Sequence, residues 1–496
     1  MKPKVLLINL PYVVRDIDVN RSKIRSFLAV PYGLLSIATY NKEYAHTIVI
    51  DCDAEENYRD KIIDLLWNWG PDIVGFSMMF DNSYKYLAGL IELVRSIDEN
   101  TLFILGGAAA SYSYEEIFRD QPHLDAICYS EGEIPFRDLL VSHTLCNSAW
   151  ITRLTLGDKV IPKISFVENL NDTVDIDYSY IEYEAYDMRQ AFSPFIDYSK
   201  PHNQFFLVTS RGCPFKCSFC SNASIHGKKM RFIDVDSIIK HVKHLVNSYG
   251  MDVLTIYDDQ LLIDMPRAKE LFKRLTPFNL RIECPNGLSV RYIDQEMADV
   301  MRGAGLDTAY LAIESGSSYV LKELINKPLK LEQVEPAVKA LRSADFFIHG
   351  FFVMGMPGET DEHRRITRDF IQDIDIDWCG FNMATPVRGS KLYADCIKNG
   401  WIKPQKLQDI VDKKYIIHVP GTNPIEIERC VYEMNIDVNF THNRRMRIGG
   451  YKTAAACFKE VLRRYPGHKV AQTYLKQCEA KIKGGKLNGE VPARPR

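Results

Sequence analysis

No apolar run in this sequence approaches the ~20 residues that a membrane-spanning helix needs. The chain also lacks a net charge of either sign, because 62 Lys and Arg residues nearly balance 64 Asp and Glu residues. This balance gives no reason to expect a nucleic acid or an anionic membrane as a partner. The apolar run near Met1 is short and lacks a small-residue cleavage site, so we interpret it as a β-strand and expect a cytoplasmic protein.

Residues 1–142 alternate short apolar runs with amphipathic helical patterns. The runs are Val5–Leu10, Thr47–Asp51, Ile73–Met79, Leu102–Gly107 and Ala126–Ser130. This alternation predicts an α/β fold, a doubly wound (Rossmann-like) parallel sheet covered by helices on both faces. A ligand crevice is expected at the carboxyl ends of its strands. A dinucleotide is disfavoured as the ligand, because no Gly-x-Gly-x-x-Gly follows the first strand.

Residues 143–203 break this alternation, and we interpret them as a linker. Within them, Ile151–Leu156 and Lys159–Ile164 flank Gly157-Asp158, a dipeptide that suits the tight turn of a β-hairpin. The tract 175–198 is rich in Asp, Glu and Tyr and has no clear period. We therefore expect this tract to wrap the surface.

Residues 204–399 return to the alternation of strands and helices. Six apolar runs are present: Phe205–Thr209, Val253–Tyr257, Arg281–Cys284, Thr308–Ile313, Ile348–Met354 and Gly380–Ala384. Each of the first five is followed by a helical pattern. Six βα units in series predict a partial barrel, since a complete barrel needs more, and they place catalytic groups at the carboxyl ends of the strands.

The remaining residues are expected to form a small helical region. Residues 400–483 are assigned to it, with 400–448 mostly irregular. Small and aromatic residues at helical spacing follow Gly449, with Pro466 ending the first helix, in the manner of one tetratricopeptide unit. A single unit cannot bury its own face, so packing on the barrel is the simpler expectation and a protein partner is the alternative. Residues 484–496 are rich in Gly, Pro and charge and are expected to be a disordered tail.

Three of the twelve cysteines lie close together, directly after the first strand of the predicted barrel. Cys213, Cys217 and Cys220 have the spacing Cys-x3-Cys-x2-Cys, which puts three thiolates on one short loop. Each thiolate can bind one iron of a [4Fe–4S] cluster, and three cysteines leave one iron open. The open iron can chelate the amino and carboxylate groups of a methionine moiety. The other nine cysteines are scattered and are expected to be reduced, as is usual in the cytosol.

Two other interpretations of these cysteines are open. A zinc site formed by Cys217, Cys220, His241 and His244 leaves Cys213 unused, and its two histidines are spaced one residue too tightly for the usual finger. Three incidental core cysteines are disfavoured, because Gly, Pro and Lys residues surround them.

The cysteine spacing, its place after the first strand and the six βα units together resemble the radical SAM superfamily. The resemblance implies a [4Fe–4S] cluster on the three cysteines that cleaves S-adenosylmethionine (SAM) reductively to a 5′-deoxyadenosyl radical. The implied SAM contacts are Phe219, Asp258, Asp259, Glu314, Ser315 and Gly355. Tyr257-Asp258-Asp259 stands where the family usually has Gly-Gly-Glu, so which of the two acids contacts SAM stays open.

Residues 1–142 resemble the cobalamin-binding domain that precedes many radical SAM barrels. The resemblance implies a corrin in the strand-end crevice, contacted by Leu10, Pro11, Gly33, Ser77, Gly106, Gly107, Glu131, Gly132 and Glu133. No Asp-x-His-x-x-Gly motif is present, so no histidine is expected to ligate cobalt from below. Ala108-Ala109 follows Gly106-Gly107 where relatives often have a histidine, so a vestigial domain without a corrin is the alternative.

Taken together, the resemblances imply a cobalamin-dependent radical SAM methyltransferase that methylates an unactivated carbon or a phosphinate. The nearest alternative keeps both cofactors and carries out cyclisation, ring contraction or oxidation. A non-catalytic cobalamin sensor is a remote alternative, because a sensor does not need an open iron. The expected partners are a small-molecule, peptide or protein substrate and an external one-electron reductant such as flavodoxin or ferredoxin.

Overall fold

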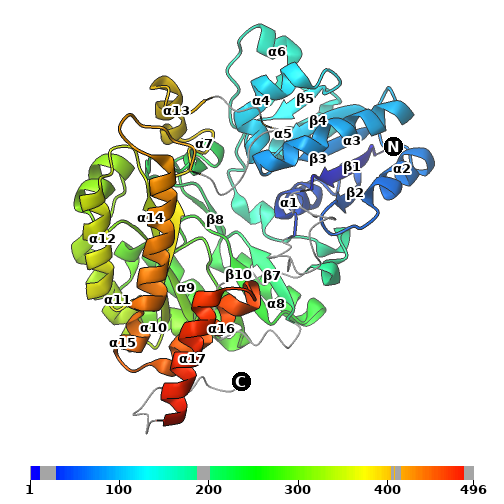
Figure 1. Cartoon of the computed structure of the whole chain (residues 1–496). Helices are drawn as coiled ribbons and strands as arrows, with labels where there is room; N and C mark the ends of the chain where they lie inside the picture. Colours follow the sequence, from blue (N-terminus) through cyan, green and yellow to red (C-terminus); the bar gives the residue numbers. More distant parts are fainter. Residues whose placement is uncertain (1, 12–29, 187–201, 404–406, 408–414, 485–496) are drawn as a thin grey trace.

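The computed structural model describes residues 2–11, 30–186, 202–403, 407 and 415–484 (Figure 1). Six strands near the amino terminus form one sheet in the order β2-β1-β3-β4-β5-β6. They are β1 (Lys4–Asn9), β2 (His46–Asp51), β3 (Ile73–Ser77), β4 (Leu102–Gly106), β5 (Ala126–Cys128) and β6 (Trp150–Thr152). The first five are parallel, which confirms the predicted parallel sheet, and β6 runs antiparallel to β5.

Helices cover both faces of this first sheet. α1 (Tyr32–Tyr40) and α5 (Glu133–Ser142) pack on the face that carries Val5 and Leu7 of β1. α2 (Tyr58–Asn68), α3 (Tyr84–Ile97) and α4 (Ala108–Asp120) pack on the opposite face, which carries Leu6 and Ile8. Successive residues of β1 are therefore buried on opposite sides, as a doubly wound fold requires. The strand order reverses between β1 and β3, and ligands of such sheets bind outside the carboxyl ends at that point.

The hairpin predicted within residues 151–164 is wrong. β6 ends at Thr152, and Arg153–Gly157 form the short helix α6 instead of a strand. The Thr152 hydroxyl accepts a hydrogen bond from the backbone N–H of Thr155 at 3.2 Å, and the Thr155 hydroxyl accepts one from the backbone N–H of Thr152 at 2.8 Å. This reciprocal capping starts a helix where the turn residues suggested a hairpin.

The tract that follows lies partly in the core, so the expectation that it wraps the surface is wrong for its first residues. Ile176 and Tyr178 are buried together with the barrel strands, and the Tyr178 hydroxyl donates to the Phe206 carbonyl at 3.0 Å. Tyr178 belongs to the 3-10 turn Tyr178–Tyr180, and Tyr183 of the next 3-10 turn, Tyr183–Ala185, packs against the same core. Because 3-10 turns follow neither the strand nor the helix period, sequence periodicity does not reveal the burial. The rest of the tract, from 187 onward, lies outside the described residues.

Six further parallel strands confirm the predicted partial barrel. They are β7 (Gln204–Leu207), β10 (Val253–Ile256), β11 (Arg281–Glu283), β12 (Thr308–Glu314), β13 (Phe347–Met354) and β14 (Trp378–Met383). They form two sheets in the orders β11-β10-β7 and β12-β13-β14. Isolated bridges from Ile282 to Leu306 and from Leu288 to Leu311 join the two sheets. In Figure 1 this green and yellow barrel lies beside the blue and cyan first sheet.

Helices follow the barrel strands in the order that the sequence pattern predicts. They are α8 (Val235–Tyr249), α9 (Met265–Leu275), α10 (Gln295–Ala304), α11 (Val334–Ser343) and α12 (Asp361–Asp373). α10 shows why the sequence folds this way. The Asp294 side chain caps its start by accepting from the backbone N–H of Met297 at 2.7 Å. Gly305 ends it with φ +107, where an added Cβ would lie 2.0 Å from the Leu280 carbonyl oxygen.

The carboxyl-terminal helices lie on the barrel or at its ends (Figure 1). They are α13 (Lys391–Lys398), α14 (Pro424–Ile436), α15 (Arg444–Arg447), α16 (Tyr451–Arg464) and α17 (Lys469–Gly484). α14, the π-helical turn Asp437–Thr441 and α15 are helical, so the expectation of an irregular 400–448 is wrong for those residues. Phe458 of α16 packs with Phe440 against Trp378 at the start of β14, so this helix pair buries a face on the barrel. Residues 485–496, assigned to a disordered tail, lie outside the described residues.

Within the described ranges, the structure contains no helix that is long and apolar enough to cross a membrane.

Candidate active site

The three clustered cysteines line one cavity of about 280 Å³ at the carboxyl ends of the barrel strands. Its other walls come from residues after β10 and β11, at the end of β12 and just beyond it: Asp259, Gln260, Asn286, Gly287, Ser289, Val290, Arg291, Ala312, Glu314, Lys327, Pro328 and Leu329. Phe215, Phe219 and Asn222 of the cysteine loop complete the lining. Segments far apart in the sequence thus bring thiols, acids and cations to one concave site, which is how active sites are built on such folds.

The cysteine loop is closed at its base by a two-stranded antiparallel ribbon, β8 (Ser210–Arg211) and β9 (Arg231–Phe232). Gly212 starts the loop with φ +99, and an added Cβ would lie 2.3 Å from the Lys229 carbonyl oxygen. Only glycine fits this close approach at a left-handed φ. The backbone N–H of Cys213 donates to the Gly227 carbonyl at 3.1 Å, which folds the two ends of the loop together.

The thiols suit an iron–sulfur cluster better than a single metal ion. Among the residues that the structure describes, no three His, Cys, Asp or Glu side chains are arranged to hold one metal ion. The zinc interpretation is therefore wrong, since zinc needs all its ligands around one centre. A cubane cluster needs only that each thiolate reach a different iron. Burial raises the pKa of the Cys217 thiol to about 11, against the opposing charge of Lys327, and bound iron would deprotonate such a thiol outright.

The two neighbouring acids after β10 have different roles. Asp258 is buried; it accepts from the backbone N–H and hydroxyl of Thr209, each at 2.5 Å, and from the Ser210 hydroxyl at 2.6 Å. It thereby ties β10 to the segment that leads into the cysteine loop and does not line the cavity. Asp259 does line the cavity, and burial raises its pKa. Of the two acids, the structure places only Asp259 where a ligand of the cavity could meet it.

Glu314 ends β12 inside the cavity, in the left-handed region at φ +71. Its Oε1 accepts from the Nζ of Lys327 at 3.2 Å, and both side chains are mostly buried. The sequence analysis missed Lys327, because a single lysine in a loop gives no signal by itself. Together these two side chains offer a cation and an anion beside the cysteines, which is what the amino, carboxylate and hydroxyl groups of SAM require.

Two of the other residues implied for SAM lie outside the cavity lining. Ser315 is buried, and its hydroxyl is hydrogen-bonded to that of Thr367 at 3.1 Å. The Gly355 carbonyl accepts from the Tyr415 hydroxyl at 2.6 Å, and an added Cβ on Gly355 would lie 2.8 Å from Tyr415. The glycine therefore serves packing between β13 and the carboxyl-terminal region. Phe219, in contrast, lines the cavity as expected.

At the carboxyl ends of the first sheet, the structure shows features that fit a large apolar ligand. Met79 and Phe80 follow β3 and are 50% and 47% exposed, forming an apolar ledge. Among the described residues, no atom lies within 4 Å of a Cβ added at Gly33, in the first turn of α1. Of the residues implied for cobalamin, Ser77 and Gly106 end β3 and β4 at this edge, and Leu10 and Pro11 follow β1 as buried residues. Gly107 is required by the backbone turn after β4, since an added Cβ would lie 2.4 Å from the Met78 carbonyl oxygen.

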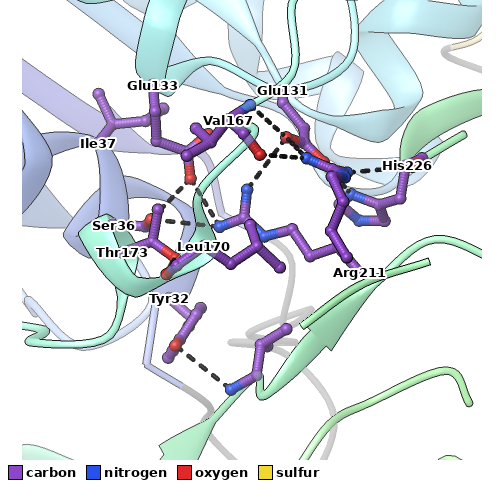
Figure 2. Close-up of polar contacts among 12 residues, drawn as sticks. Tyr32, Ser36, Ile37, Glu131, Glu133, Val167, Leu170, Thr173, Arg211 and His226 are labelled. Atoms are coloured by element: carbon purple, nitrogen blue, oxygen red, sulfur yellow. Dashed lines mark hydrogen bonds and ion pairs between the residues drawn. The ribbon is translucent and has the colours of Figure 1, made fainter. Parts of the chain in front are cut away.

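Glu131 and Glu133 bind side chains of the barrel part of the chain (Figure 2). Both are about 4% exposed, so neither faces an open crevice. Burial alone would raise the pKa of Glu131, but hydrogen bonds from Arg231 and His226 and the charge of Arg211 outweigh it and lower that pKa. Burial is likewise outweighed at Glu133, where Arg211 lowers the pKa. Gly132 packs on α1, where an added Cβ would lie 2.8 Å from Ile37.

Comparisons with known proteins agree with both halves of this architecture. Residues 207–371 match the family model of the radical SAM superfamily, and residues 25–140 match that of the B12 binding domain. The chain is 30% identical over 495 residues to cytidylyl-2-hydroxyethylphosphonate methyltransferase of Streptomyces wedmorensis, an alignment that covers 89% of this chain and 91% of that protein. It is 24% identical over 377 residues to anaerobic magnesium-protoporphyrin IX monomethyl ester cyclase of Cereibacter sphaeroides, covering 73% and 58% of the two chains.

A solved structure shares the fold. The radical S-adenosylmethionine methyltransferase TsrM of Kitasatospora setae, with tryptophan substrate and a SAM analog bound, superposes with a TM-score of 0.65. The match covers 86% of this chain and 83% of that one at 15% sequence identity. At this identity the likeness shows the fold alone.

The fold and the cysteine-lined cavity thus define a radical SAM enzyme. More particularly, the chain belongs to the B12-binding radical SAM enzymes, the family that contains its methyltransferase relative. It is a cobalamin-dependent radical SAM enzyme, and its cofactors are a [4Fe–4S] cluster, SAM and cobalamin.

Proposed function

We propose that this enzyme is a methyltransferase that methylates an unactivated carbon or a phosphinate. The observation that carries the proposal is the 30% identity, over nearly the whole of both chains, to a relative named as a methyltransferase of cytidylyl-2-hydroxyethylphosphonate. Identity over both halves means that the relation includes the first domain as well as the barrel. The bound cofactors would supply reductive cleavage of SAM and a transferable methyl group.

In this proposal Cys213, Cys217 and Cys220 hold the cluster. The Phe219 ring, next to the last cysteine, lies in the cavity wall where it would stack on the SAM adenine. All four residues come from one loop, so the same backbone conformation sets the position of the cluster and of the adenine.

Three charged side chains would bind the polar groups of SAM. Lys327 would pair with the carboxylate, while Glu314 and Asp259 would accept from the ribose hydroxyls or the ammonium. Because Lys327 and Glu314 already hold one another at 3.2 Å, their positions are fixed before SAM binds. Preorganised charges of this kind lower the entropy lost on binding.

The cobalamin crevice would lie at the carboxyl edge of the first sheet. Gly33, Ser77 and Gly106 would give the corrin close access to the backbone, and the exposed ledge of Met79 and Phe80 would contact its apolar face. We propose 1–142 as the cobalamin domain and 204–399 as the radical SAM barrel, with β6 as an addition to the first sheet from the intervening 143–203. Glu131 and Glu133 are not proposed as cobalamin contacts, because both are buried against arginines of the barrel part.

A second candidate keeps the cofactors and forms a ring instead of adding a methyl group. The observation that favours it is the 24% identity to a relative named as a cyclase. That relative is matched over 58% of its own length, against 91% for the methyltransferase, so the methyltransferase is the better-supported function.

An external donor such as flavodoxin or ferredoxin would deliver the electron, and we propose a cytoplasmic location. All twelve cysteines are free of disulfides, as is usual in a reducing compartment. The substrate is proposed only as a small molecule or a peptide.

The test is anaerobic reconstitution with iron, sulfide and hydroxocobalamin, followed by metal analysis and assay of the products of SAM. We expect about four irons per chain, stoichiometric cobalt, and both 5′-deoxyadenosine and S-adenosylhomocysteine. Cys217→Ala should lose the cluster and both products, whereas the control Cys146→Ala, at an exposed cysteine, should keep them. Full iron and cobalt with 5′-deoxyadenosine but no S-adenosylhomocysteine would rule out the methyltransferase and favour the ring-forming alternative.

A further inference from the structure

Two carboxylates of the first domain meet two arginines at the base of the cysteine loop. Arg231 binds Glu131 with both terminal nitrogens, at 3.0 and 2.6 Å. Arg211 binds Glu133 at 2.7 Å and lies 3.4 Å from Glu131. In Figure 2, Arg211 reaches toward Glu131 and Glu133, and His226 lies beside Glu131. The Ser36 hydroxyl donates to Glu133 at 2.7 Å. The side chains of both glutamates are 5% exposed or less, so the charges are isolated from water.

The two arginines lie directly opposite each other in the β8–β9 ribbon that closes the loop. Like charges on facing residues of a ribbon destabilise it. Glu131 receives both guanidinium groups and removes that repulsion. Because Arg211 is followed immediately by Gly212 and Cys213, the ribbon fixes where the first cysteine stands. The carboxylate that pairs with both arginines at the base of the cysteine loop therefore comes from the other domain.

Further contacts from the first domain reach the far side of the same loop. The Tyr112 hydroxyl of α4 donates to the Ser221 carbonyl, next to Cys220, at 2.8 Å. The Ser130 hydroxyl donates to the Ile225 carbonyl, and His226 lies 3.0 Å from Glu131. The first domain thus contacts the cysteine loop before its first cysteine and after its last.

The barrel holds the middle of the loop. The backbone N–H of Ser218 donates to the Ile325 carbonyl at 2.7 Å, and its carbonyl accepts from the backbone N–H of Leu392 at 2.7 Å. The loop is therefore fixed at its centre by the barrel and at both ends by the first domain.

We propose that Glu131 and Glu133 are positioning residues that make the conformation of the cysteine loop depend on the first domain. They act through Arg211 and Arg231, not by touching a cofactor. In this arrangement the cluster can adopt its working position only when the two domains are docked. The proposal does not depend on whether the enzyme transfers a methyl group or forms a ring.

The test uses the anaerobically reconstituted holoenzyme and three variants. Glu131→Gln removes the charge that separates the arginines, and Tyr112→Phe removes a single hydrogen bond to the loop. Tyr84→Phe is the matched control, because its hydroxyl bonds Asp120 and Gln121 within the first domain, without contact to the loop. Two quantities are measured: hydrogen exchange of peptides covering 212–230, and the electron paramagnetic resonance spectrum of the reduced cluster with and without SAM.

We expect loop exchange to rise about tenfold or more in Glu131→Gln, which corresponds to ~1.4 kcal/mol of local stability. A smaller rise is expected in Tyr112→Phe, and none in Tyr84→Phe. SAM is expected to change the spectrum of the reduced cluster. Normalised to intact cluster, this change should differ from wild type in Glu131→Gln and Tyr112→Phe and should match wild type in Tyr84→Phe. If Glu131→Gln does not fold, Glu133→Gln, which keeps a hydrogen-bond acceptor for Arg211 and Ser36, is measured in its place with the same expected result.

The proposal is overturned if loop exchange and the SAM-dependent spectrum, each normalised to intact cluster, match wild type although overall stability falls. In that case the charge cluster would only hold the two domains together, without positioning the cysteine loop. Neither readout needs a methyl acceptor, so failure of this proposal is distinguishable from failure of the proposed methyltransferase.

Discussion

Replacing Gly212 by alanine should disturb the cysteine loop at the point where it leaves β8. Gly212 has φ +99, and the new Cβ would lie 2.3 Å from the backbone carbonyl oxygen of Lys229. That oxygen belongs to the returning arm of the same loop and cannot rotate away as a side chain would. The arms must therefore separate, and Cys213, whose backbone N–H is bonded to the Gly227 carbonyl, must move with them.

The expected loss of unfolding free energy in Gly212→Ala is the sum of two contributions. A left-handed φ costs an L-residue with a Cβ about 1–2 kcal/mol. Relief of an overpacked contact by a backbone shift costs about 1–3 kcal/mol more. Gly421→Ala is a control that isolates the first contribution, because Gly421 has φ +83 and no atom of the described part of the chain lies within 4 Å of its added Cβ.

The assay combines urea unfolding of each variant with its iron content after anaerobic reconstitution. We expect Gly421→Ala to lose about 1–2 kcal/mol of unfolding free energy and to bind iron as wild type does. Gly212→Ala should lose more stability and bind less iron. Equal stability losses in the two variants, with full iron in both, would refute the reasoning, since the contact with Lys229 would then have no consequence.

Two other predictions concern charges. Lys327→Met should weaken SAM binding about tenfold or more, because a charge-assisted bond contributes roughly 1.5–3 kcal/mol; the control Lys322→Met removes a lysine whose side chain is 84% exposed and should leave the dissociation constant unchanged. Equal affinities by equilibrium dialysis would remove Lys327 from the site. The second prediction follows from the lowered pKa of Glu131 in the folded protein. The contribution of this carboxylate to the free energy of unfolding should be complete above its pKa in the unfolded chain, about 4.3. This contribution should be lost as the pH falls below that value. The gap in unfolding free energy between wild type and Glu131→Gln should narrow between pH 5 and pH 3, and a constant gap would contradict the ion pairing.

Much of the fold was predictable because it rests on local patterns. The six barrel strands lie within a few residues of the predicted runs, since a buried parallel strand is a continuous apolar run wherever it sits in the sheet. The same holds for the five parallel strands of the first sheet. β6 was not predictable in this way, because three residues pairing antiparallel to β5 leave no period in the sequence.

The candidate site was predictable in part. The cysteine spacing indicated the thiols of the cavity, and the strand-end positions of Asp259 and Glu314 indicated its acids. Asp258 has the same sequence signal as Asp259, but the alternation of side chains along the chain turns it toward Thr209. Lys327 reaches the cavity from beyond the end of β12, and nothing local marks it.

The sequence by itself determined the two α/β units, their order and the three thiols on one loop, because periodicity and spacing are properties of neighbouring residues. Only the tertiary structure decided what Glu131 and Glu133 do. Their position after β5 resembles a cofactor edge, yet Glu131 binds Arg231, a residue 100 positions away. A buried charge must find an opposite charge wherever the fold brings one near, and sequence distance carries no information about that choice.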